Sequence, residues 1–120
     1  MATMHEVIEY VDGVKPNVYS DEDKCGWISR IENTIRIEVH GEEPRKYSFP
    51  QDADNELCAP HPFDDVYSLY VMAMIDYHNK EINGYNQTAV LFADRLEAYK
   101  RYYIQRNPHG KAKNFRNVMG

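Results

Sequence analysis

The chain lacks a long hydrophobic run. The longest apolar stretch in 120 residues is Leu69–Ile75, far short of the roughly 20 residues that a membrane-spanning helix needs. Its first residues also lack the basic and apolar stretches of a secretory signal. These absences predict a soluble protein that is made in the cytoplasm and has no contact with a membrane.

Cysteine is scarce as well. Two cysteines, Cys25 and Cys58, cannot form a disulfide framework, and in a reducing compartment both are expected to be free thiols. Cys58 and His61 have the spacing of metal ligands, but a zinc site needs four ligands and no second pair follows at a recognisable interval. We therefore predict neither a metal site nor a cofactor.

Motifs that carry catalysis are missing. The chain has no glycine loop that could cradle a phosphate, and no motif around either cysteine suggests an activated nucleophile. The pair Asp64 and Asp65 is explained by the electrostatics of a helix start. The acidic cluster Asp52, Asp54 and Glu56 lacks the glycine and the closing glutamate of an EF-hand. The sequence therefore predicts a protein that is not an enzyme.

Acidic residues are absent from the end of the chain. Residues 100–120 contain six basic residues and no acid, whereas residues 1–99 hold the other eight basic residues and all 19 acids. A basic segment of this kind can bind a phosphate backbone, or it can lie across the acidic body of a neighbouring copy. Because the body is so acidic, we favour the neighbouring copy.

Capping signals and apolar spacing predict two helices in the first third of the chain. Thr3 and Glu6 match a capping box, so a helix is expected over about residues 4–12. Ser20, followed by three acids, begins a second helix that Gly41 stops. The β-branched residues of its last turn also fit the beginning of a strand.

The middle of the chain is predicted to be irregular. Residues 41–63 contain four of the six prolines, which argue against a helix. Residues 45–49 fit one strand of a short β-hairpin. The apolar residues of this segment favour a loop that is packed or binds a partner over a loose one.

The second half of the sequence predicts an αα-hairpin. A third helix opens at Pro62, and its apolar residues occur nearly all round, so it must be buried centrally or by partners. Asp76 and Lys80, four residues apart, are expected to pair on its surface. A long fourth helix is predicted from Glu81 to about Arg106. Its apolar seam follows a heptad spacing: Ile82, Tyr85, Ala89, Phe92, Leu96, Tyr99 and Tyr103.

The expected fold is therefore mainly α. It is a small helical bundle with a long carboxyl-terminal αα-hairpin, an irregular middle loop with a short β-hairpin as an option, and an extended basic tail. Residues 1–110 are predicted to form a single helical domain and residues 111–120 the tail.

Several short segments carry a family resemblance. They are Gly13-Val14-Lys15-Pro16-Asn17, Tyr19-Ser20, Lys24-x-x-Trp27-Ile28, Pro62-Phe63-Asp64-Asp65-x-Tyr67, Met74-Ile75-Asp76-Tyr77-x-Asn79-x-Glu81, Tyr85-Asn86 and Phe92. With them, about residues 4–108 resemble a family of small proteins encoded in the structural modules of tailed phages and prophages of Firmicutes. These proteins are thought to be head–tail connectors, also called neck or adaptor proteins.

The resemblance implies a non-enzymatic virion protein of the head–tail neck, made in the cytoplasm of the bacterial host. It implies a ring, typically of twelve copies, docked between the portal protein and the next neck or tail-completion protein. The isolated chain is expected to be a monomer if ring contacts need the portal as a template. The acidic body suits a channel wall past which DNA moves without specific binding, and the basic tail suits contact with a neighbouring subunit or the portal.

The predicted subunit and partner interface combines the helical hairpin with the tail. Its residues are Leu69, Met72, Tyr85, Tyr99, Tyr103, Arg106, Lys111, Lys113, Phe115 and Arg116. Two alternatives remain at this point. One is a small phage-encoded binding protein that inhibits a host nucleoprotein or defence complex through its acidic surface. The other is a DNA-binding accessory that uses the basic tail.

Overall fold

The computed structural model describes residues 2–107, and within them the chain forms an all-α globule without β-strands. The α-helices are α1 (Met4–Val14), α2 (Asp21–Thr34), α3 (Asp65–His78) and α4 (Ile82–Arg106). A short π-helix, η1 (Ile35–Val39), continues α2. The predicted basic tail, residues 111–120, lies outside the described residues.

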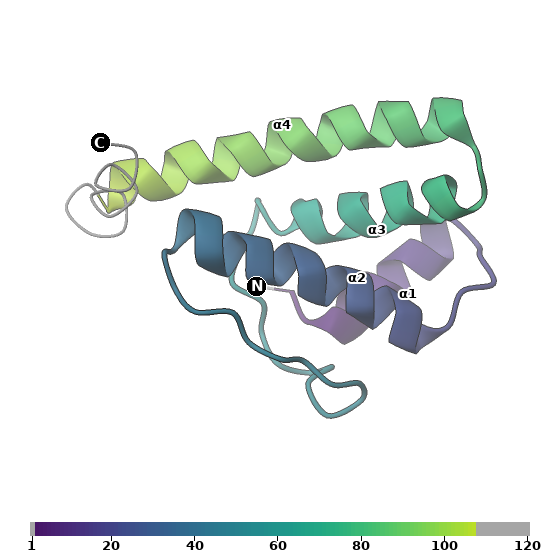
Figure 1. Cartoon of the computed structure of the whole chain (residues 1–120), viewed down its shortest axis with the longest axis horizontal. Helices are drawn as coiled ribbons and strands as arrows, with labels where there is room; N and C mark the ends of the chain where they lie inside the picture. The colour runs from purple at the N-terminus through teal and green to yellow at the C-terminus, as the bar shows by residue number, and fades with distance from the viewer. Residues whose placement is uncertain (1, 108–120) are drawn as a thin grey trace.

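The helix α3 is the centre of the arrangement. It contacts α1, α2 and α4, and Figure 1 shows α4 along one side of it and the pair α1 and α2 along the other. The helix α4 reaches beyond the amino-terminal end of α3, where it meets η1. Together α3 and α4 form the predicted αα-hairpin.

Local signals set the starts of the first two helices. The Thr3 hydroxyl accepts a hydrogen bond from the Glu6 backbone N–H at 3.2 Å, and the Glu6 carboxylate accepts one from the Thr3 N–H at 3.0 Å. This confirms the predicted capping box. The Ser20 hydroxyl caps α2 by accepting from the Asp23 N–H at 3.0 Å.

The option of a strand at the end of α2 is wrong. Residues 35–39 continue the helix as η1 and bury Ile35 and Val39 in the core. The helical path ends just before Gly41, whose φ of 67° lies in the left-handed region. The predicted glycine stop is therefore confirmed, since glycine enters this region without steric cost.

The option of a β-hairpin at residues 45–49 is also wrong. The middle segment contributes to a single isolated bridge among the described residues, between Thr3 and Glu56. The Arg45 backbone is paired instead with the side chain of Asn33 on α2. The segment is nevertheless packed, because Ala53, Leu57 and Ala59 are buried.

The third helix is buried centrally, as its all-round apolar pattern allowed. Val66, Tyr67, Val71 and Ile75 have no exposed surface. They meet the buried residues of α1, α2 and η1, which include Met4, Val7, Ile8, Val11, Ile28, Ile31 and Ile35. The helix begins at Asp65, three residues after Pro62.

The predicted surface pair of Asp76 and Lys80 is wrong. The helix α3 ends at His78, and Lys80 lies in the connector with a φ of 61°. It therefore does not sit one helical turn after Asp76. The Asp76 side chain is 2% exposed and faces the Lys15 ammonium, with 2.9 Å between Oδ1 and Nζ. Oδ1 of Asp76 forms no hydrogen bond among the described residues, so its attraction to Lys15 is mainly electrostatic.

Candidate functional site

The structure disperses the predicted interface residues. Leu69 and Met72 are half-buried on α3, and Tyr85 is half-buried near the start of α4. Arg106 is exposed, with its guanidinium 4.9 Å from the centroid of the Tyr102 ring. Of the remaining helical members, Tyr103 is half-buried and Tyr99 is buried. The tail members Lys111, Lys113, Phe115 and Arg116 fall outside the described residues.

Tyr99, one of the predicted interface residues, belongs to the core of the folded chain. It is 2% exposed, and its hydroxyl lies 2.7 Å from Nε2 of His40, at the end of η1. The His40 ring also stacks on Tyr103, with 4.5 Å between the ring centroids. These contacts fasten the second half of α4 to η1. Burial raises the pKa of the Tyr99 hydroxyl above its ordinary value.

The outer face of α4 carries apolar side chains that the chain itself leaves exposed. We use this term for Ile82, Val90, Leu91 and Ile104, whose exposed fractions are 61%, 61%, 55% and 46%. Asn86 and Gln87 line a shallow hollow there with Val90 and Leu91. Sequence reasoning placed Ile82 in the apolar seam, and the folded chain leaves this residue exposed. Sequence reasoning missed Val90 and Leu91, although both lie in the apolar run Ala89–Phe92.

Residues from the family-like segments meet where α1, α2 and α3 approach the start of α4. Besides the ion pair of Lys15 and Asp76, the Tyr19 hydroxyl donates a 2.6 Å hydrogen bond to Oδ1 of Asn79. The Trp27 ring stacks on His78 at 5.4 Å between centroids. These contacts join helices, so the motif residues described here have a structural role.

Gly84 allows α4 to approach α3 closely at this joint. A Cβ atom at position 84 would lie 2.9 Å from Oδ2 of Asp76, which is closer than van der Waals contact permits. Gly26, on the exposed side of α2, has no atom within 4 Å of the corresponding position. The absence of a side chain therefore matters at Gly84 and not at Gly26.

A second buried polar group fastens α1 to α2. Lys24 is 3% exposed, and its ammonium donates to Oδ1 of Asp12 at 2.7 Å and to Oδ1 of Asn17 at 3.2 Å. Asp21 lies 3.7 Å away on the same helix. The buried charge is thus compensated by several oxygen atoms, as burial requires.

A third buried polar cluster lies between α2, α3 and the middle segment. The Glu32 carboxylate, 2% exposed, accepts from the Tyr67 hydroxyl at 2.5 Å and from the Cys58 N–H at 2.9 Å. The Tyr67 oxygen in turn accepts from the Ala59 N–H at 2.9 Å. Burial, followed by the nearby Glu32 charge, raises the pKa of Tyr67 far above its ordinary value.

The same surroundings determine the chemistry of Cys58. Burial and then the Glu32 charge raise the pKa of its thiol to about 12. At neutral pH this thiol stays protonated, and a protonated thiol is a poor nucleophile. His61, which has metal-ligand spacing from Cys58 in the sequence, is exposed, and its Nδ1 lies 3.6 Å from Oδ1 of Asp64. The described residues contain no group of three or more side chains suited to a metal ion.

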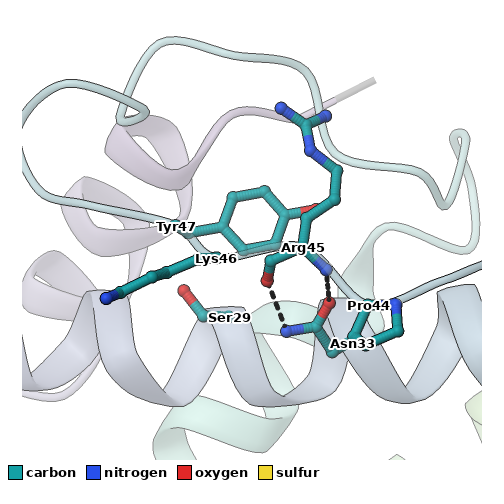
Figure 2. Close-up of a pocket in the computed structure, with 6 residues that line it drawn as sticks. All are labelled: Ser29, Asn33, Pro44, Arg45, Lys46 and Tyr47. Atoms are coloured by element: carbon teal, nitrogen blue, oxygen red, sulfur yellow. Dashed lines mark hydrogen bonds between the residues drawn. The ribbon is translucent and has the colours of Figure 1, made fainter.

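A shallow pocket lies between α2 and the middle segment (Figure 2). The Asn33 carboxamide accepts from the Arg45 N–H at 2.8 Å and donates to the Arg45 carbonyl at 2.9 Å. Arg45 places its guanidinium 5.4 Å from the centroid of the Tyr47 ring. The contacts in this pocket hold the extended segment against α2.

Comparisons with known proteins were made by family model, by sequence and by solved structure, and none gives a match for this chain. In addition, no helix within residues 2–107 has the length and apolar character needed to cross a bilayer.

Proposed function

We propose that this protein is a non-enzymatic head–tail connector of a tailed phage or prophage. In this proposal it forms a ring, of twelve copies, between the portal protein and the next neck or tail-completion protein. The observation that carries the proposal is the outer face of α4. Only Tyr99 is buried among the 25 residues of this helix. The exposed apolar side chains of α4 suit a contact between proteins.

The rest of the fold supports an adaptor. The helices α1, α2 and α3 are joined by contacts that give the buried ionisable groups Lys24, Glu32 and Asp76 polar or charged neighbours, which suits a scaffold. The hairpin then presents one long helix to its surroundings. The choice of a head–tail ring, among possible assemblies, comes from the motif resemblance.

Charge supports the proposed position of the protein in the particle. All 19 acids of the chain lie before residue 100. An acidic surface repels the DNA backbone, so DNA could pass through such a ring without being held. Lys100 lies 3.7 Å from Glu38 of η1, and the other basic residues at the end of the chain would then contact a neighbouring copy or the portal protein.

The proposal is tested by quantitative mass spectrometry of purified particles from the phage or induced prophage that encodes this chain. We expect a copy number nearly equal to that of the portal protein. Absence of the chain from complete particles would contradict the connector function. Its recovery with a host nucleoprotein instead would favour a host-directed inhibitor.

Deletion of residues 111–120 provides a second test. We expect the shortened chain to fold with an unchanged circular dichroism spectrum and to lose ring assembly or portal docking. Particles that assemble fully with the shortened chain would refute the role of the tail in assembly.

A further inference from the structure

An apolar groove with an acidic rim lies between α1 and the amino-terminal end of α3. Its first part, of about 590 Å³, is bounded by Val7, Tyr10 and Asp64 among others. A second hollow shares Glu6 and Tyr10 with the first and continues along α1 to Val14. We call the two together the α1–α3 groove.

The floor of this groove exposes large apolar side chains. Tyr10 and Val14 are 57% and 56% exposed, whereas Val7 beside them is 5% exposed. Covering such side chains is favourable by roughly 25 cal/mol per Å² of apolar surface removed from water. The groove is therefore suited to an aromatic or aliphatic side chain.

The rim of the groove is acidic. It carries Glu6, Glu9, Asp64 and Asp65, and no Lys or Arg is among the described residues that line it. Asp65 lies 2.9 Å from the Arg95 guanidinium, and Asp64 lies 3.6 Å from the His61 ring. Glu9 is exposed on α1. A ligand for this groove should combine positive charge with an apolar group.

The end of the same chain has this composition. Residues 111–116 contain three basic side chains, Lys111, Lys113 and Arg116, and one aromatic ring, Phe115. They contain no acidic residue. This segment complements both the floor and the rim of the α1–α3 groove.

The described chain ends beyond the amino-terminal end of α3, which is also the end of α3 that borders the groove. The Tyr102 ring lies 4.9 Å from the ring of Phe63, the residue before Asp64. The helical rise of 1.5 Å per residue places Asn107 only about 8 Å further along the axis. Eight extended residues from Asn107 to Phe115 can span up to about 27 Å. The segment can therefore reach the groove of its own chain.

We propose that residues 111–116 dock in the α1–α3 groove of the same chain when the protein is not assembled. Phe115 covers Tyr10 and Val7, and the basic side chains face Glu6, Glu9 and Asp64. The tether makes this contact intramolecular, which corresponds to an effective concentration in the millimolar range for a short linker.

This inference does not depend on the connector function. If the chain forms the proposed ring, the same segment would pass to a neighbouring copy. Such an exchange of identical elements replaces an internal contact by an equivalent one between subunits.

Zero-length carbodiimide cross-linking of the full chain tests the docking directly, because it joins lysines only to carboxylates that they touch. An equal mixture of ¹⁴N- and ¹⁵N-labelled chains separates cross-links within one chain from those between two. We expect Lys111 and Lys113 to be joined to Glu6, Glu9 or Asp64 within one chain. Cross-links only between chains, cross-links spread to remote acids such as Glu97, or none at all would overturn the proposal.

A matched pair of variants sharpens this experiment. The double change Glu9→Lys and Tyr10→Ser alters two exposed groove residues, and we expect the yield of intrachain cross-links to fall about tenfold. Asp94→Lys makes the same charge change at an exposed site of α4 and should leave the yield unchanged. An equal loss in both variants would mean that net charge, and not the groove, governs the contact.

Amide NMR spectra of the full chain give an independent reading. Phe115→Ser should shift the signals of Val7, Tyr10 and Ser68, which line the groove, while the signals of α2 stay in place. Unchanged groove signals would contradict docking even if some cross-links formed.

Discussion

The two helices of the hairpin use apolar residues in opposite ways. In α3, six of 14 residues are buried, and three helices surround it. In α4, one of 25 residues is buried, because this helix packs mainly on α3 and leaves its other side open. The comparison teaches that apolar content identifies a helix that will be covered, but the number of neighbours decides whether its own chain covers it.

Alkaline pH should lower the stability of the packing around α3 most strongly. In the unfolded chain Cys58 and Tyr67 lose their protons near pH 9 and 10, whereas burial keeps both protonated in the fold well beyond that, to about pH 12 for Cys58. Stability is therefore complete below about pH 9 and falls as the pH rises above it. The slope is about 1.4 kcal/mol per pH unit for each group, an upper limit for the part-exposed Cys58.

Denaturant unfolding from pH 7 to 11 measures this loss. Cys58→Ala serves as the control, since its decline should be shallower; the buried thiol of Cys25, whose pKa burial also raises, still contributes from about pH 9. A stability that stays constant to pH 11 would contradict the burial of these groups.

Tyr67→Phe should destabilise the protein by about 2 to 3 kcal/mol. It leaves the buried Glu32 carboxylate and the Ala59 N–H each without one partner, and an unpaired buried polar group costs its desolvation energy. Tyr85→Phe is the matched change on α4 and should cost less than about 0.5 kcal/mol. Similar values for the two changes would erase the difference between the helices.

Lys15→Met should cost about 2 kcal/mol by leaving Asp76 buried without its counter-charge. This figure is discounted because a third of the Lys15 side chain is exposed to solvent. Lys80→Met, at the residue that sequence spacing paired with Asp76, should leave the free energy of unfolding within about 0.5 kcal/mol. A larger loss of stability in Lys80→Met than in Lys15→Met would instead support the pair of Asp76 and Lys80 that sequence spacing predicted.

Gly84→Ala should destabilise the joint between α3 and α4 by about 1 to 2 kcal/mol, because the new Cβ meets the Asp76 carboxylate. Gly26→Ala, in open space on α2, should stabilise the protein by about 0.5 to 1 kcal/mol. Thermal unfolding of both variants measures the contrast. A stabilised Gly84→Ala variant would show that the helices can separate without cost.

The smallest effect on stability is expected on the outer face of α4. Replacing both Val90 and Leu91 with serine should change the free energy of unfolding by less than about 1 kcal/mol, because both side chains are more than half exposed. The same variant should fail to enter particles in a complementation assay. Normal entry would separate this face from the proposed assembly.

Much of the fold could be predicted because its signals are local. The Thr3 and Ser20 caps, the Gly41 stop and the long α4 each depend on residues a few positions apart. The pairs Lys15 with Asp76, His40 with Tyr99, and Glu32 with Tyr67 could not be predicted. Their members are 35 to 61 residues apart, and spacing along one helix says nothing about contacts across the fold.

The candidate site was predicted less well for a related reason. Heptad spacing finds the side of α4 that packs on α3, and this is why it selected Tyr99. It does not find the opposite side, where Val90 and Leu91 lie. The proposed assembly itself depends on the motif resemblance.

Amide hydrogen exchange of the isolated chain tests the central claim most directly, since it compares the two helices in one experiment. We expect the amides of α3 to exchange only by global unfolding. Those near both ends of α4 should exchange much faster, with the slowest signals of that helix around Tyr99. Equal protection along α3 and α4 would contradict the claim that α4 is completed by a partner.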